Sequence, residues 1–180
     1  IPTLMRYAYR MDLATIQNSA LRAAEWLMEI QKPSGGWQAQ RMTDNRPEVV
    51  FNTGQVIRGM MSAYKATEKE SYLDSAVRAG NWLAEIQHPE GYWKRYASME
   101  QHRVYDSFVD APLAALYRIT GDDKYRIAAE KNLEWIIHEK MKPNGWFEDF
   151  DNTQKHNDRP IIHTIAYTLD GLIDASVSLD

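Results

Sequence analysis

The sequence predicts an all-α fold in which helical hairpins repeat along the chain. The pattern Arg-Ala-x-x-Trp-Leu-x-x-x-Gln-x-x-x-Gly-x-Trp occurs at residues 22–37 and again at 78–93, and a weaker copy spans 131–146. The tryptophans that mark the copies, Trp26, Trp82 and Trp135, lie 56 and then 53 residues apart. Self-similarity at a nearly fixed period indicates stacked units of the same structure.

Apolar residues at helical spacing, together with start and stop signals, predict six helices. Their expected ranges are about 12–31, from Pro47 to about 64, 71–87, 103–119, 122–141, and from Asp158-Arg159-Pro160 nearly to the end. Pro112 lies inside the fourth range, so we expect a kink there that frees the backbone carbonyl of Phe108. Asp122 is expected to cap the fifth helix.

Three hairpins result, each with a Trp-bearing helix followed by a helix rich in small residues. Small residues let helices approach closely, so the Trp helices are expected to form an outer ring and the others an inner ring. The small residues are Gly54, Gly59, Ala111, Ala114, Ala115, Ala166 and Gly171. The long connectors 32–47, 88–103 and 142–159 gather on one face, which in repeat folds is usually the binding face.

Composition limits the function classes. The 180 residues, 44% hydrophobic and 26% charged, suit one domain spanning 1–180. A net charge of −4 disfavours nucleic acid as a partner, and the lack of a long apolar run disfavours a membrane. Without cysteine there is no thiolate nucleophile or Cys-ligated zinc, and the cellular compartment is not predicted. The histidines lack the spacing of a zinc helix, so neither a metal nor a cofactor is predicted.

Three hairpins are close to half of a closed ring. The chain starts at Ile1 and stops at Asp180, where another hairpin would begin, so we expect a fragment of a longer toroid. Two other arrangements would cover the flanks: capping by residues 1–11, or self-association of two chains.

The repeated pattern resembles the QW motif of squalene and hopene cyclases, and more generally the (α/α) toroid. The resemblance implies structural roles for Gln31, Trp37, Gln87 and Trp93, with each Gln binding the backbone at the start of a neighbouring helix. The Asp-x-Asp-Asp acid of the cyclases is missing, since Asp122-Asp123 lies at a short return loop on the other face. The zinc ligands of protein prenyltransferases are also missing.

The inner-helix phrases at 51–59 and 162–171 look like those of glycan-active toroid proteins. These are uronyl hydrolases, sugar epimerases, heparinase-type lyases and polysaccharide-biosynthesis proteins. The resemblance therefore implies a carbohydrate ligand.

Two pairs of residues could supply acid/base chemistry. Asp106 and Asp110 are four apart at the start of a predicted helix, where the helix dipole favours the ionised form. They are interpreted as an acid/base pair, or alternatively as a cap plus a carboxylate that binds an arginine. His163 and Tyr167 have the same spacing, and His163 is a general-base candidate or a hydrogen-bonded structural histidine.

Corresponding positions in the three repeats are expected to converge on one funnel. The predicted substrate-binding residues are Asn52, Gln55, Arg103, Tyr105, Tyr167 and Trp146. Basic residues outnumber acidic ones in the connectors, which favours an anionic sugar such as a uronate. The acidic stretch 148–152 is interpreted as a solvated loop, with a divalent cation site as the alternative.

The sequence thus predicts a carbohydrate-active domain that binds or processes an oligosaccharide at the long-loop face. An enzyme of this kind would be a hydrolase, lyase or epimerase that uses acid/base side chains. A noncatalytic helical-repeat interaction module and an isoprenoid-handling toroid protein remain alternatives.

Overall fold

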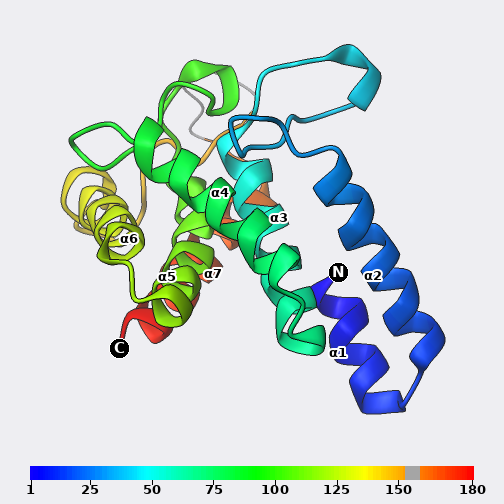
Figure 1. Ribbon diagram of the computed structural model, residues 1–180. Helices are drawn as coiled ribbons and strands as arrows, with labels where there is room; N and C mark the ends of the chain where they lie inside the picture. The colour runs from blue at the N-terminus through cyan, green and yellow to red at the C-terminus, as the bar shows by residue number, and fades with distance from the viewer. Residues whose placement is uncertain (153–158) are drawn as a thin grey trace.

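The computed structural model describes residues 1–152 and 159–180, and the prediction of an all-α fold is confirmed for them (Figure 1). The α-helices are α1 (Pro2–Met11), α2 (Ala14–Glu29), α3 (Val50–Thr67), α4 (Glu70–Ile86), α5 (Asp110–Thr120), α6 (Asp123–Trp135) and α7 (Ile162–Leu179). Shorter segments are the 3₁₀ turns η1 (Met42–Asp44), η2 (Ser98–Glu100) and η3 (Val104–Val109), and the π-helical η4 (Ile136–Lys140).

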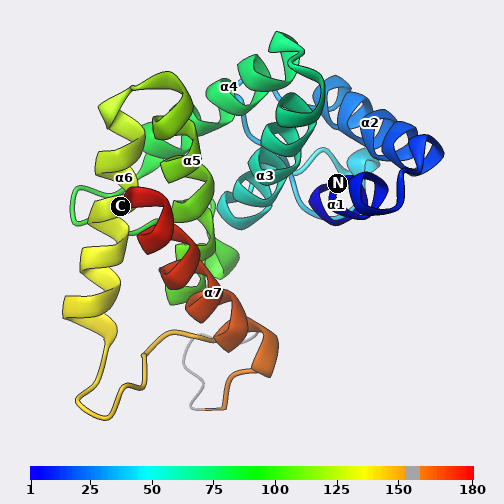
Figure 2. The ribbon, with the colours of Figure 1, turned by 90° about the horizontal axis from the view of Figure 1, so that it is seen from below.

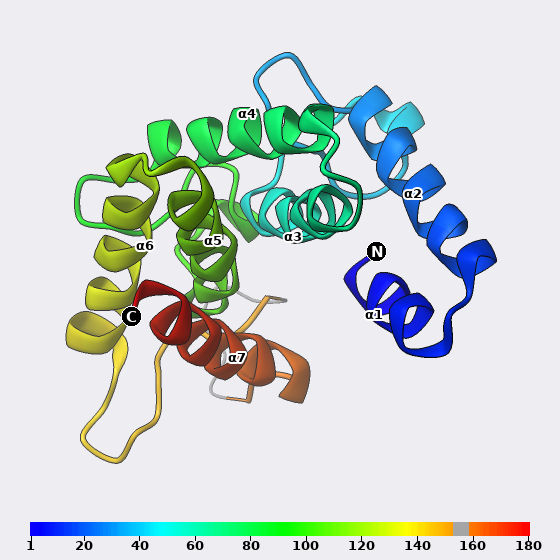
Figure 3. The same ribbon diagram turned by 60° about the horizontal axis from the view of Figure 1, so that its bottom comes forward.

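The helices form an open double arc (Figure 3). The outer arc is α2, α4 and α6, and the inner arc is α1, α3, α5 and α7, with each helix in contact with the next member of its own arc. Seen from below, the short returns between paired helices face the viewer (Figure 2). The long connectors lie at the opposite end, at the top of Figure 1.

The first eleven residues correct the sequence analysis, which assigned no helix to them. Pro2 stands in the first turn of α1, where a missing N–H costs nothing, and Met5 and Ala8 are buried. The helix packs against α2 and α3. It therefore takes the inner position that precedes α3.

Two predicted helix starts were also early. Helix α2 begins at Ala14, because Asp12 has a left-handed backbone (φ 50°) that ends α1. Helix α3 begins at Val50 and not at Pro47. The N–H of Val49 donates to the carbonyl of Trp37 (2.8 Å), which keeps the chain before Val50 extended.

The predicted fourth helix is divided into η3 and α5. Pro112 stands in the first turn of α5, so the break precedes it and no kink follows it. The carbonyl of Phe108 is available, as predicted, and accepts a hydrogen bond from Arg58 Nη2 (3.0 Å). Arg58 also pairs with Asp174 (3.0 Å) and stacks on the Phe108 ring at 3.8 Å. One arginine thus ties α3, η3 and α7 together.

Glycines set the separation of the inner segments. A Cβ added to Gly171 would lie 2.4 Å from the backbone nitrogen of Phe108, and one added to Gly54 would lie 3.1 Å from Cα of Val109. Because real Cβ atoms do not approach backbone so closely, larger residues would push α7 and α3 away from η3.

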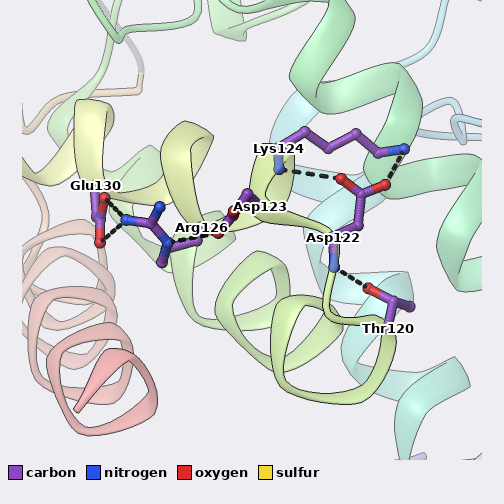
Figure 4. Close-up of polar contacts among 6 residues, drawn as sticks. All are labelled: Thr120, Asp122, Asp123, Lys124, Arg126 and Glu130. Atoms are coloured by element: carbon purple, nitrogen blue, oxygen red, sulfur yellow. Dashed lines mark hydrogen bonds and ion pairs between the residues drawn. The ribbon is translucent and has the colours of Figure 1, made fainter.

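The return between α5 and α6 is fixed by its own polar side chains (Figure 4). Asp122 caps α6 as predicted: its Oδ1 accepts from the N–H of Lys124 (3.2 Å), and its Oδ2 pairs with the Lys124 ammonium (2.7 Å). Arg126 bridges Asp123 and Glu130 along the same helix.

The glutamines of the repeated pattern join successive outer helices. Gln31 Nε2 donates to the carbonyls of Gly35 (2.7 Å) and of Ser75 in α4 (2.9 Å). Gln87 does the same one repeat later, with Gly91 and with Ala128 in α6 (2.8 Å each). Each glutamine therefore fixes its loop to the next outer helix.

The glycines of the pattern bring that loop against the helix. Gly35 and Gly91 have φ of +106° and +99°, which L side chains rarely adopt. An added Cβ would lie 2.4 Å from the carbonyl oxygen of Arg78 in α4, or 2.2 Å from that of Lys131 in α6. We call the Gln and Gly contacts with the next outer helix the clamp.

The tryptophan that ends each of the first two copies of the pattern is buried beside its own helix. Trp37 Nε1 donates to the carbonyl of Leu27 (2.8 Å), and Trp93 Nε1 donates to that of Leu83 (2.9 Å). The exposed fractions of Trp37 and Trp93 are 2% and 0%. These rings fill the space between the helix and the connector that follows it.

Replacing Trp93 by alanine should lower the free energy of unfolding by about 3–5 kcal/mol, because it removes a fully buried ring and leaves a cavity. Urea denaturation followed by circular dichroism measures the change. The matched control is Trp26→Ala, since that ring is 51% exposed and should cost far less. Unchanged stability combined with lost ligand binding would instead place Trp93 in the ligand site.

Candidate functional site

A hollow of about 460 Å³ opens at the face of the long connectors. It brings together four residues that the sequence analysis proposed, Asn52, Tyr105, His163 and Tyr167. The full lining, which we call the inner hollow, is Ala39, Val49, Phe51, Asn52, Ala97, Ser98, Met99, Tyr105, Asn152, His163, Thr164 and Tyr167. Its size lies within the range of about 300–1,000 Å³ that is typical of ligand sites.

The starts of α3, η3 and α7 position these side chains. Asn52 lies in the first turn of α3, Tyr105 in η3, and His163 in the first turn of α7. Among the described residues, no side chain caps the start of either α3 or α7. Backbone carbonyls accept from some of the first N–H groups: the N–H of Val50 donates to Tyr96 (3.0 Å) and that of Thr164 to Ile161 (3.2 Å). The positive ends of the dipoles of two 18-residue helices still lie at the inner hollow, which favours an anion.

Aromatic rings form one wall of the inner hollow. The Phe51 ring lies 5.0 Å from that of Tyr167 and 5.4 Å from that of Tyr105, and His163 meets Tyr167 edge-on at 5.7 Å. Phe51 also stacks near Phe108 (5.9 Å). Such a wall with polar neighbours suits a ligand that has both apolar faces and hydroxyl edges.

Asp106 and Asp110 lie outside the inner hollow, buried behind it. Their exposed fractions are 2% and 0%, and neither oxygen of Asp110 has a hydrogen-bond partner among the described residues. Burial raises the pKa of Asp106 to about 8, although the Arg103 charge opposes the shift. Burial and then the nearby Asp106 charge raise the pKa of Asp110, against the Arg58 charge.

The expectation that the helix dipole keeps this pair ionised is therefore wrong. A helix dipole stabilises a carboxylate at the helix start only modestly, whereas removing that carboxylate from water costs far more free energy. With a pKa of about 8, Asp106 keeps its proton at neutral pH, and burial shifts the pKa of Asp110 in the same direction. Tyr105 is affected too, because burial and then the Asp106 charge raise its pKa above the usual value.

Three other predicted binding residues do not line the inner hollow. Gln55 is half-buried on α3, and Arg103 is buried, with its Nη2 4.0 Å from the sulfur of Met99. Trp146 is 43% exposed and packs edge-on against Phe150 at 5.0 Å. Their binding roles stay predictions.

In the third copy of the pattern, Lys140 replaces the glutamine and forms a charged cluster. Its ammonium lies 2.9 Å from Asp149 Oδ2 and 3.1 Å from His102 Nε2, and His102 lies 3.0 Å from the same carboxylate. Burial raises the pKa of Asp149, but hydrogen bonds from His102 and Lys140 outweigh it, so the net shift is downward. This cluster ties the third connector to the second.

The acidic stretch 148–152 is thereby partly engaged within the protein. Glu148 pairs with Lys142, and Asp151 is buried. Across residues 1–152 and 159–180, no group of three or more His, Asp or Glu side chains could hold a metal ion. Of the predicted helix start at Asp158-Arg159-Pro160, Asp158 lies outside the described residues, and Arg159 and Pro160 precede α7, which begins at Ile162.

Sequence reasoning missed several lining residues. Ala39, Ser98, Met99 and Asn152 come from connectors, whose paths no periodic pattern specifies. Phe51 lies in a phrase that the sequence analysis quoted, but its apolar side chain gave no sign of a ligand site.

An arc of paired helices whose inner starts surround a polar and aromatic hollow is consistent with a toroid-type protein. Comparison with protein families agrees, because the profile described as Glycosyl Hydrolase Family 88 matches residues 19–159. The chain belongs to this family. No curated protein matches the chain. None of the described helices is long and apolar enough to cross a membrane.

Stability should fall as the pH rises from 5 to 8.5. In this window the native state keeps a proton on Asp106 that the unfolded chain releases, since the ordinary pKa is 3.8 and the native pKa about 8. We expect a loss of about 4 kcal/mol in unfolding free energy from this carboxyl. Asp106→Asn should remove that part of the slope, while Asp110, whose pKa is also raised, continues to contribute.

Urea denaturation at several pH values measures this slope. Asp74→Asn, which changes an exposed aspartate on α4, is the control and should leave the slope as in the wild type. An Asp106→Asn variant with the wild-type slope would show that Asp106 is ionised throughout.

Proposed function

We propose that this chain binds and processes an oligosaccharide that ends in a uronate, with the uronate in the inner hollow. The observation that carries the proposal is the convergence of two uncapped helix starts and an aromatic wall on one hollow. Membership of a glycoside hydrolase family supports a sugar as the ligand, and this family acts on unsaturated uronates.

The electrostatics of the inner hollow favour the carboxylate of a uronate over a neutral sugar. Among the described residues, none of those that line the inner hollow is an Asp or Glu, whose charge would repel a carboxylate. The N–H groups at the starts of α3 and α7 can donate to carboxylate oxygens, while Asn52, Ser98 and Asn152 can bond to hydroxyls. The rings of Phe51 and Tyr167 supply an apolar surface for the sugar face.

We assign His163 as the acid/base group that faces the bound sugar. It is exposed at the hollow and stands against Tyr167, and an imidazole can act as a general acid or base. Asp106 then acts from behind the wall: because it keeps its proton at neutral pH, it adds no negative charge near the site, and burial shifts the pKa of Asp110 in the same direction. Direct proton transfer by either carboxyl would require the wall at Tyr105 to move.

The test uses an unsaturated uronyl disaccharide and its neutral counterpart. Calorimetry should show at least tenfold tighter binding of the uronyl sugar, and mass spectrometry should detect its conversion. His163→Ala should reduce turnover by about 10²–10⁴-fold. The control His138→Ala changes an exposed histidine on η4 and should leave turnover unchanged.

Two results would contradict parts of this proposal. Binding without conversion would favour the noncatalytic interaction module. Equal binding of the uronyl and neutral sugars would remove the role assigned to the helix starts.

A further inference from the structure

The third copy of the repeated pattern, residues 131–146, makes none of the clamp contacts in the described part of the chain. Lys140 replaces the glutamine. A Cβ added to Gly145 would meet nothing within 4 Å, whereas one added to Gly35 or Gly91 would press against an outer helix. Trp146, which ends the copy, is 43% exposed, whereas its two counterparts are buried. The third copy therefore does not repeat the structural role of the first two.

Lys140 lies instead in the charged cluster with His102 and Asp149, and aromatic rings enclose this cluster. The Lys140 ammonium is 5.1 Å from the centre of the Trp135 ring. The His102 ring lies 5.3 Å from the Trp135 ring and 5.3 Å from the Tyr92 ring. The side chains of Lys140 and Asp149 are only 15% and 16% exposed. Because water screens such a pair less than an exposed one, it holds its two partners together more firmly.

The cluster fixes the third connector at Asp149. This residue has φ of 61°, a left-handed conformation that is uncommon outside glycine. Its carbonyl accepts a hydrogen bond from the N–H of Val104 (3.3 Å), the first residue of η3. The N–H of the preceding Glu148 donates to the carbonyl of Lys140 (3.0 Å). The connector is thus attached beside the start of η3 through both the side chain and the backbone of one residue.

Asn152 follows three residues later and lines the inner hollow. Its carbonyl accepts a hydrogen bond from Oγ of Ser98 (3.4 Å), which lines the same hollow. The side-chain Oδ1 of Asn152 is buried and has no hydrogen-bond partner among the described residues. Since a buried acceptor without a partner costs free energy, a donor on a bound ligand would stabilise it. A sugar hydroxyl is a donor of this kind.

We propose that Lys140 is a positioning residue for the inner hollow. Through Asp149 it holds the third connector so that Oδ1 of Asn152 accepts a hydrogen bond from a hydroxyl of the bound sugar. This inference rests on the proposed function, which places the sugar in the inner hollow. His102 supports the same contact from the second connector. In the third copy, the pattern therefore shapes the ligand site, whereas in the first two it joins outer helices.

Calorimetry with the unsaturated uronyl disaccharide tests this role. Asn152→Ala and Lys140→Ala should each weaken binding by about 3–10-fold, the equivalent of one hydrogen bond. Because Lys140 acts through Asn152, the double variant should bind no more weakly than Asn152→Ala alone. Lys140→Arg keeps a cation beside Asp149 and should restore most of the affinity. The control Lys142→Ala breaks the exposed pair with Glu148 in the same connector and should bind as the wild type does.

Hydrogen exchange in the free protein gives a second readout that needs no sugar. The N–H of Val104 is protected by its hydrogen bond to the carbonyl of Asp149. In Lys140→Ala this N–H should exchange about tenfold faster than in the wild type, because the acceptor is no longer held in place. In Lys142→Ala its exchange rate should not change.

The outcomes separate this inference from the proposed function. Additive losses of affinity in the double variant, or full affinity in Lys140→Ala, would overturn the positioning role and leave the proposed function standing. An unchanged exchange rate of the Val104 N–H in Lys140→Ala would overturn the positioning role as well. Failure of the wild type to bind the disaccharide would overturn both proposals.

Discussion

The clamp between each Gln–Gly loop and the next outer helix is the interaction on which the arrangement depends. Gln31 and Gln87 reach carbonyls of α4 and α6 that stand one repeat apart, Ser75 and Ala128. Gly35 and Gly91 bring the loop backbone against the same helices. Since both contacts recur, the same Gln and Gly interactions fix the angle between α2 and α4 and again the angle between α4 and α6. The connector that leaves each loop begins from a fixed point.

The position of the inner hollow depends on where these connectors begin. The first connector runs from the clamp to Val49, whose N–H is held by the carbonyl of Trp37, and the second places the carbonyl of Tyr96 on the N–H of Val50. The start of α3 is thus held by two connectors. Arg58 then links α3 to η3 and α7, so the three inner starts keep one geometry. The close packing buries Asp106 and Asp110, and this burial raises the pKa of both carboxyls.

The sequence specified most of the helices because their apolar spacing and caps are local signals. The clamp residues were recognisable for the same reason, as a repeated pattern with Gly at a position that needs positive φ. Helix α1 was missed because only Met5 and Ala8 of its residues are buried, too few to give a clear period. Its burial depends on α2 and α3, which are tertiary neighbours.

Ionisation and loop paths could not be predicted from sequence. The spacing of Asp106 and Asp110 correctly suggested neighbouring side chains, but their protonation depends on burial by segments distant in the sequence. The predicted site was half assembled: Asn52, Tyr105, His163 and Tyr167 meet, whereas Gln55, Arg103 and Trp146 do not line the hollow. Connector residues such as Ser98 and Met99 carry no periodic signal at all.

The short reach of the clamp bears on how the chain folds during synthesis. Gln31 bonds to a residue 44 positions away, and Gln87 to one 41 positions away. Each repeat therefore closes as soon as the first turns of the following outer helix are made, without waiting for distant sequence. Each clamp joins only adjacent repeats, so repeated units can add in order from the N-terminus. The same residues that shape the arc thus also allow it to grow one repeat at a time.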